Sequence, residues 1–377
     1  MDVKDTFLQL VRLGIGCEPV PGSTFQISGP LSVEDWQALE EMANEHGLQG
    51  VMLDGMEKLP QELRPEKKAI LQSIGLLIQS EQQYASQEHA ANEMALLLHQ
   101  HNIRTYVLKG AVVAECYPRP EHRRSVDMDC FLMAHTDSTD NTETSQVSED
   151  VWEKGNRVLE EQGFEVWRDF YKNSTIVLPG LMVENHRFLT PFRGNKTLRK
   201  LEIWMQSQFK SSEVQKVQEG RFEGTWLYRP PLMVSAMFLI EHAYSHFLHE
   251  GLTWRMVLDW QMFSKMHRQE IDWKELEARV DAFGFRRFYD SFCRLGEYLL
   301  GELTSDNLQL VDQRMLADIW APLDVHETVM GFRGKLALAS NTWRARWKYR
   351  HFTDLTWLQA LWIQVKGVLL EREVRLI

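Results

Sequence analysis

The spacing of apolar residues divides the chain into three parts. Through residues 1–100 the apolar positions recur at helical spacing and end in a long predicted helix from Pro65 to Gln100. Residues 101–228 contain short apolar runs, several of which alternate with polar residues as half-buried strands do. Helical spacing returns over residues 229–377. The pattern predicts an α+β fold in these three parts, with a β-sheet core flanked by N-terminal and C-terminal helical regions.

Two acids stand on one predicted strand, which runs from Val126 to Leu132. Asp127 and Asp129 are two residues apart, so both side chains project from the same face of that strand. Adjacent carboxylates repel each other, and an isolated strand gains nothing from them. A divalent cation such as Mg²⁺ takes oxygen ligands and leaves positions open for substrate phosphates. We therefore expect Asp127 and Asp129 to bind Mg²⁺ or Mn²⁺.

A glycine turn precedes this strand. An apolar run ends at Lys109-Gly110-Ala111, and a short helical pattern follows to Cys116. Gly110 has no side chain, so backbone N–H groups there can approach a phosphate closely. The ammonium group of Lys109 could neutralise phosphate charge. We expect Lys109, Gly110 and Ala111 to contact a nucleotide.

The order of strand, glycine turn, short helix and strand with Asp-x-Asp resembles the nucleotidyltransferase fold. The stretch LKGAVVAECYPRPEHRRSVDMDCFL is similar to an uncharacterised family of nucleotidyltransferases. The resemblance covers most of the chain and weakens after about residue 310. It implies a mixed β-sheet core and a reaction: transfer of a nucleoside monophosphate from a nucleoside triphosphate, with ATP as the favoured donor, to a hydroxyl group.

The resemblance also implies a third carboxylate, at Glu184. Pro179-Gly180 separates two strand-like runs and predicts a hairpin, whose second strand carries Glu184. With the two aspartates, this acid would bind metal or accept the proton of the attacking hydroxyl. His186 lies on the same strand face and could orient phosphate, or equally serve as a hydrogen-bonded structural histidine. Glu202 remains an alternative third acid.

Three further residues are expected near the nucleotide. Arg123 falls where the family usually carries an arginine four residues before the first aspartate. Arg255 and Asp259 belong to a second block that resembles the family and lies beside its nucleotide pocket. These two residues are four apart on a predicted helix, so an ordinary helix ion pair explains them as well.

Composition limits the kinds of partner and the cellular compartment that we expect for the protein. The net charge of −11 disfavours broad nucleic-acid binding, which relies on Lys and Arg. The four cysteines form no C-x-x-C motif, which fits a reducing compartment. The first residues lack a signal-peptide pattern, and no apolar stretch approaches the roughly 20 residues that span a bilayer. We expect a cytoplasmic protein without a transmembrane segment.

Three functions agree with this sequence. The first is a Mg²⁺-dependent nucleotidyltransferase that acts on a small molecule or on a protein. The second is a catalytically inactive nucleotide-binding or regulatory module, although such a module has no reason to retain three converging acids. The third is an RNA-directed transferase. It is supported only by basic and aromatic residues over 331–377, which an amphipathic helical subdomain explains more simply.

Overall fold

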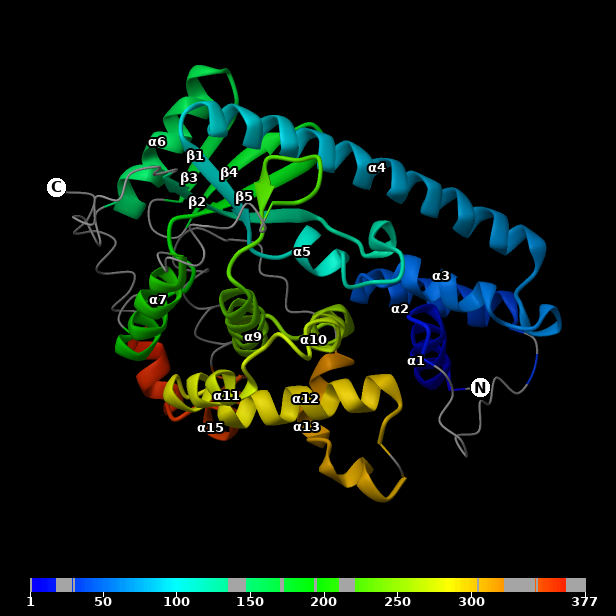
Figure 1. Cartoon of the computed structure of the whole chain (residues 1–377). Helices are drawn as coiled ribbons and strands as arrows, with labels where there is room; N and C mark the ends of the chain where they lie inside the picture. Colours follow the sequence, from blue (N-terminus) through cyan, green and yellow to red (C-terminus); the bar gives the residue numbers. More distant parts are fainter. Residues whose placement is uncertain are drawn as a thin grey trace.

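The protein combines a central β-sheet with helices on both of its faces (Figure 1). The computed structural model describes residues 2–17, 29, 31–134, 147–169, 173–192, 195–209, 221–303, 305–321, 343 and 345–363. Helices precede the sheet in the chain and follow it. This confirms the predicted α+β class, with a sheet core flanked by two helical regions.

The described residues form a six-stranded mixed sheet of order β3-β4-β5-β2-β1-β6. Strand β2 pairs in parallel with β5, and β1 pairs in parallel with β6, whereas the other neighbours are antiparallel. The predicted hairpin at Pro179-Gly180 is confirmed, because it joins β4 to β5. The strands are β1 (Ile103–Val107), β2 (Asp127–Ala134), β3 (Glu165–Asp169), β4 (Asn173–Leu178), β5 (Leu181–His186) and β6 (Leu227–Tyr228).

Helices α4 and α6 cover the sheet face opposite the two aspartates. The long predicted helix is confirmed as α4, and both helices contact β2 or its neighbours. Alternate residues of the strands, such as Cys130, Ile176 and Val183, are fully buried beneath them. The N-terminal helices are α1 (Val3–Gly14), α2 (Val33–His46), α3 (Gln49–Glu57), the 3₁₀ turn η1 (Gln61–Leu63) and α4 (Lys67–Gln100), and α6 spans Val147–Glu161.

The C-terminal helices lie under the aspartate-bearing face, and α9 and α10 come nearest to it (Figure 1). Phe238 of α9 packs edge-on against His186 at the end of β5. Among the described helices, none is long and apolar enough to cross a membrane. The helices after β2 on this side are α7 (Lys196–Phe209), α9 (Leu232–His249), α10 (Trp254–Met266), α11 (Trp273–Ala282), α12 (Arg286–Leu300), η4 (Ser305–Leu310), α13 (Gln313–Ile319) and α15 (Arg346–Phe352).

Much of the basic and aromatic tail lies outside the described residues. Its described part packs into the helical region rather than standing apart from it. Tyr349 and Phe352 of α15 are buried, and Lys348 donates a hydrogen bond to the Phe247 carbonyl oxygen at 2.7 Å. For these residues, the amphipathic helical subdomain is the better interpretation of the sequence pattern.

A buried histidine ties the N-terminal helices to the loop before β2. His122 ends the 3₁₀ turn η2 (Pro120–His122), and its two ring nitrogens lie 2.8 Å from Asp54 of α3 and 2.9 Å from Glu81 of α4. A Cβ on Gly50 would lie 2.6 Å from the His122 carbonyl oxygen, so only glycine allows α3 this close. Burial lowers the pKa of His122, but the two carboxylates outweigh it and raise the pKa above its ordinary value. His122 therefore binds both acids as an imidazolium.

We expect His122→Gln to destabilise the protein more at low pH than at high pH. Because the folded pKa is raised, the stabilisation is complete below the ordinary value of about 6.5 and is lost as pH rises through the folded pKa. Urea unfolding should show a loss of about 2 kcal/mol near pH 6 and a smaller loss near pH 9. The surface pair of His267 with Glu270 provides the control, and His267→Gln should change little at either pH. An equal loss at both pH values would contradict the charged state of His122.

Candidate active site

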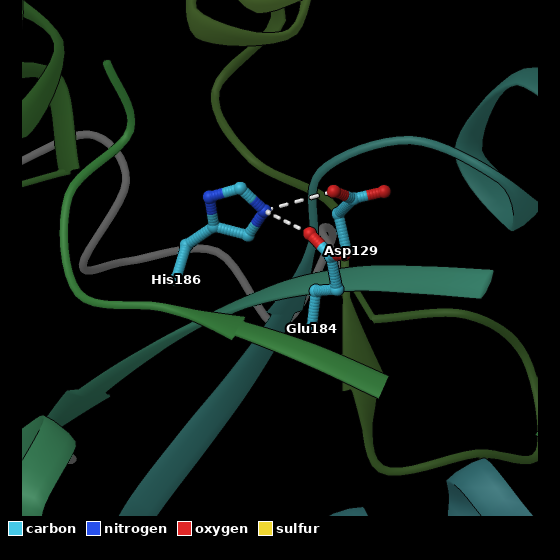
Figure 2. A group of neighbouring side chains, drawn as sticks. All are labelled: Asp129, Glu184 and His186. Atoms are coloured by element: carbon cyan, nitrogen blue, oxygen red, sulfur yellow. Dashed lines mark hydrogen bonds and ion pairs between the residues drawn. The ribbon is translucent and has the colours of Figure 1, made fainter. Parts of the chain in front are cut away.

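The parallel pairing of β2 with β5 brings the predicted acids together. Asp129 stands opposite Glu184 in register, and Asp127 stands opposite Met182. Residues in register on neighbouring strands point to the same sheet face, so Glu184 lies beside Asp129. Figure 2 shows Asp129, Glu184 and His186 directed toward one another. One ligand atom from each of these three lies within 4.8 Å of the others, so the group could hold a metal ion.

Asp129 is buried and stays ionised. Its Oδ1 accepts a hydrogen bond from His186 Nε2 at 2.8 Å, and its Oδ2 lies 3.0 Å from Lys109 Nζ. Burial would raise the pKa of Asp129, but the Lys109 ammonium and the His186 hydrogen bond hold it well below its usual range. The buried Oδ2 has the Lys109 ammonium as its ion-pair partner and accepts no well-aligned hydrogen bond among the described residues. This carboxylate therefore binds positive charge already, through Lys109.

Lys109 lies between the two aspartates. Its Nζ is 4.0 Å from Asp127 Oδ2, in addition to the contact with Asp129, and it donates a hydrogen bond to His242 Nε2 of α9 at 3.1 Å. Because an ammonium group can only donate, this His242 nitrogen is unprotonated. Asp127 is less enclosed than Asp129, with 36% of its side chain exposed against 2%. The ammonium thus supplies positive charge next to the acids.

The donor atoms suit a hard divalent cation. Asp127, Asp129 and Glu184 offer carboxylate oxygens on one face, as Mg²⁺ and Mn²⁺ prefer. Two of the three predicted metal ligands, Asp129 and Glu184, belong to the group whose ligand atoms lie within 4.8 Å of one another. The third member of that group is His186 and not Asp127. For His186 the sequence left two roles open, orienting phosphate and serving as a structural histidine; it is buried and hydrogen-bonded to Asp129. Asp129, Glu184 and either Asp127 or His186 would hold such a cation, which would supply positive charge for substrate phosphate oxygens.

Glu184 and Glu202 occupy different environments. Glu184 is half-buried, and its Oε2 accepts a hydrogen bond from Asn173 on β4 at 2.9 Å. Glu202 lies on α7 and accepts hydrogen bonds from the backbone N–H groups of Leu189 and Thr190. Burial raises the pKa of Glu202 despite those donors. Glu202 therefore holds the chain after β5 in place, whereas Glu184 faces Asp129.

A pocket adjoins the acids on the side of the glycine turn. Gly110 has a φ of 74°, and a Cβ there would lie 3.3 Å from Ser125 Oγ, so another residue would be both strained and crowded. The pocket is small, with about 20 Å³ of space that the centre of a water-sized sphere can occupy. Ala111 begins the short helix α5 (Ala111–Ala114) and is not among the residues that line it. The lining consists of Lys109, Gly110, Arg123, Ser125, Asp127, Leu239, His242, Ala243, Arg255, Met256 and Asp259.

Arg123 and Asp259 bind each other at the base of this pocket. Arg123 donates from Nε at 2.9 Å and from Nη2 at 2.6 Å to the two oxygens of Asp259, and Tyr117 donates to the same carboxylate at 2.7 Å. Burial alone would raise the pKa of Asp259, but Arg123 lowers it below its ordinary value. Among the described residues Asp259 thus pairs with Arg123, and the helix ion pair with Arg255 that its spacing allowed is not formed. This buried pair joins the loop before β2 to α10.

Arg255 connects the pocket to a second, wider one. It donates to the Arg124 carbonyl oxygen at 2.9 Å, while its Nε is buried and has no hydrogen-bond partner among the described residues. Burial and the neighbouring charge of Arg123 lower the pKa of Arg255, so an anion beside it would be stabilising. Arg255 and Met256 line both pockets. The second has about 310 Å³ of space that the centre of a water-sized sphere can occupy, and it is lined also by Asn44, Glu45, His46, Gly47, Arg124, Val126, His246, Glu250, Gly251 and Thr253.

Sequence reasoning missed three residues of the site. Asn173 could have been found, because a two-residue turn at Pro179-Gly180 fixes the hairpin register and places Asn173 opposite His186. Tyr117 and His242 could not, since they reach the site through the packing of α9 and α10 against the sheet. No spacing in the sequence indicates those contacts.

Comparison with known proteins gives one result that agrees with this geometry. A search of curated proteins gave no match, and a search of solved structures gave none. A family model described as "Uncharacterised nucleotidyltransferase" matches residues 32–144 and 146–301. The match includes the acid-bearing strands, the glycine turn and both pockets. The chain therefore belongs to this uncharacterised nucleotidyltransferase family.

Proposed function

We propose that the protein is an active, Mg²⁺- or Mn²⁺-dependent nucleotidyltransferase that uses a nucleoside triphosphate, with ATP as the favoured donor. The observation that supports this most directly is the register of Asp129 with Glu184, beside a pocket that Lys109 and Gly110 line. Carboxylates on two neighbouring strands and basic side chains beside them are the two parts such a reaction requires. The acceptor is a hydroxyl of a small molecule or of a protein.

The two connected pockets suit the donor nucleotide. The smaller pocket offers Lys109, Gly110 and Arg255 to the triphosphate, next to Asp127. The wider pocket begins at Arg255 and has room for the ribose and base. Lys109 can exchange its contact with Asp129 for one with a phosphate. Arg255 gains the anionic partner that its Nε lacks.

The reaction forms one bond and breaks one. The acceptor oxygen attacks the α-phosphorus, the bond from that phosphorus to the β-phosphate oxygen breaks, and pyrophosphate leaves with the electron pair. Glu184 accepts the hydroxyl proton, and the hydrogen bond from Asn173 to its Oε2 orients the carboxylate. A divalent cation held by the acids would supply positive charge for the phosphate oxygens. Catalysis then rests on positioning and charge neutralisation.

Calorimetric titration with ATP, GTP, CTP and UTP in Mg²⁺ tests this proposal. We expect one nucleotide to bind, and its binding to be lost in EDTA. Arg255→Met should weaken that binding about tenfold or more, because a charge-assisted hydrogen bond to phosphate is lost. The control is Arg294→Met, which removes an exposed arginine of α12 that pairs with Glu297.

Two results would contradict the proposal. If folded wild-type protein binds no nucleotide, the inactive module becomes the better interpretation. If Arg255→Met binds nucleotide as tightly as wild type does, the donor does not extend from the smaller pocket to the wider one.

A further inference from the structure

Asp129 and Asp127 each begin a row of side chains that crosses β5, β4 and β3 on one face of the sheet. The register of β2, β5, β4 and β3 aligns Asp129, Glu184, Thr175 and Trp167 in one row. The next row along the strands is Asp127, Met182, Val177 and Glu165. Residues in register share a sheet face, so all eight side chains lie on the face of the catalytic acids. We call the part of this face on β5, β4 and β3 the acceptor floor.

The acceptor floor is open and mainly uncharged. Trp167 is 55% exposed and Met182 is 47% exposed, whereas the opposite face of the same strands is buried under α4 and α6. Trp167 Nε1 donates a hydrogen bond to Glu165 Oε1 at 2.8 Å, which fixes the indole along its strand. An indole face held in this way beside hydroxyl and carboxylate groups can stack on the C–H face of a sugar ring. The surrounding Thr175 and Glu165 can bind sugar hydroxyls.

We propose that this floor binds the acceptor, and that the acceptor is a carbohydrate of two or more rings without phosphate groups. This rests on the proposed transferase function and specifies its acceptor. Neighbouring strands are about 4.8 Å apart, so Trp167 lies two strand spacings, about 10 Å, from Glu184. One sugar ring does not bridge that span. Two linked rings do, with one stacked on Trp167 and the other presenting its hydroxyl to Glu184.

The charge of the floor excludes phosphorylated acceptors. Its described ionisable side chains that reach solvent are the acids Glu165 and Glu184, with Asp127 at its edge. Arg168 of β3 points to the other face, where it pairs with Glu153 and Glu160 of α6. Phosphate would be repelled here, which also disfavours RNA. Neutral sugars and amino sugars are accommodated.

The test is binding of oligosaccharides in the absence of nucleotide. A glycan array with neutral, amino, phosphorylated and sialylated oligosaccharides should give signals for neutral or amino glycans only. Titration calorimetry with the strongest glycan should then show binding about tenfold weaker in Trp167→Ala, and partly restored in Trp167→Phe. Trp362→Ala is the matched control, since Trp362 is 64% exposed and belongs to a helical segment near the C-terminus, not to the sheet. Trp167→Ala should bind the donor nucleotide as wild type does.

The outcomes separate this inference from the proposed function. Nucleotide binding without binding of any unphosphorylated glycan would overturn the carbohydrate floor alone. So would glycan binding that Trp167→Ala leaves unchanged, or transfer of labelled nucleotide to peptide hydroxyls in place of glycans. Glycan binding that depends on Trp167 in a protein that binds no nucleotide would support the floor and refute the transferase.

Discussion

Asp127→Asn should lower the rate of nucleotide transfer about a thousandfold and leave the fold intact. The substitution removes one negative charge from the acid group while keeping its shape, and loss of several kcal/mol of charge stabilisation corresponds to an effect of this order. Asp127 is partly exposed, and its nearest cation, Lys109, keeps its closer contact with Asp129. Turnover of labelled nucleotide and the thermal midpoint, measured on the same preparation, test both parts.

Two variants serve as references for that result. Asp290→Asn also removes one acid, from an exposed pair with Arg286, and should keep full activity. Asp129→Asn should lose both activity and stability, because Lys109 and His186 then lack their buried anion. Activity of Asp127→Asn within tenfold of wild type would place the metal on the group of Asp129, Glu184 and His186 without Asp127.

Arg123→Met should destabilise the protein by about 3–5 kcal/mol, because it leaves the buried Asp259 carboxylate without its partner. Arg123 and Asp259 are nearly inaccessible, so water cannot compensate the charge. Because Arg123 lowers the folded pKa of Asp259, the contribution of the pair is complete at neutral pH and is lost as pH falls through that depressed pKa. The free energy of unfolding in urea at neutral pH measures the loss.

The double variant Arg123→Met/Asp259→Leu tests how much of this destabilisation comes from the unpaired charge of Asp259. It removes both charges, so it should be more stable than Arg123→Met alone, even though Tyr117 loses its acceptor. A double variant that is less stable than the single one would show that Asp259 is stabilised by groups other than Arg123. Nucleotide binding by the double variant would then report whether the pair also shapes the pocket.

The local sequence pattern was sufficient to predict most strands of the sheet. The alternation of Val126 to Leu132 predicted β2 and the shared face of its two aspartates, because side chains alternate on any strand. Pro179-Gly180 predicted the hairpin that carries Glu184. The long helix before β1 was also evident from its spacing. Each of these features depends on residues close together in the sequence.

The partners of the predicted residues depended on packing. Arg255 and Asp259 are four apart on one helix, yet Asp259 pairs with Arg123, which is 136 residues away in the sequence. Glu202 looked like a second choice for the third acid, yet it lies on α7 and binds the backbone after β5. Helical spacing predicts which side chains share a face of the helix. It does not predict which neighbouring helix or strand packs against that face.

By itself, the sequence determined the class of fold, the acid-bearing strand, the glycine turn and the family. The first three follow from periodicity and turn chemistry, which act over a few residues, and the family follows from the resemblance of its motifs. Only the tertiary structure decided that Glu184 stands in register with Asp129, that Lys109 lies between the acids, and that the acid rows continue to Trp167. Those relations arise from strand order and from the docking of α9 and α10. Both are set by burial of surfaces that lie far apart in the chain.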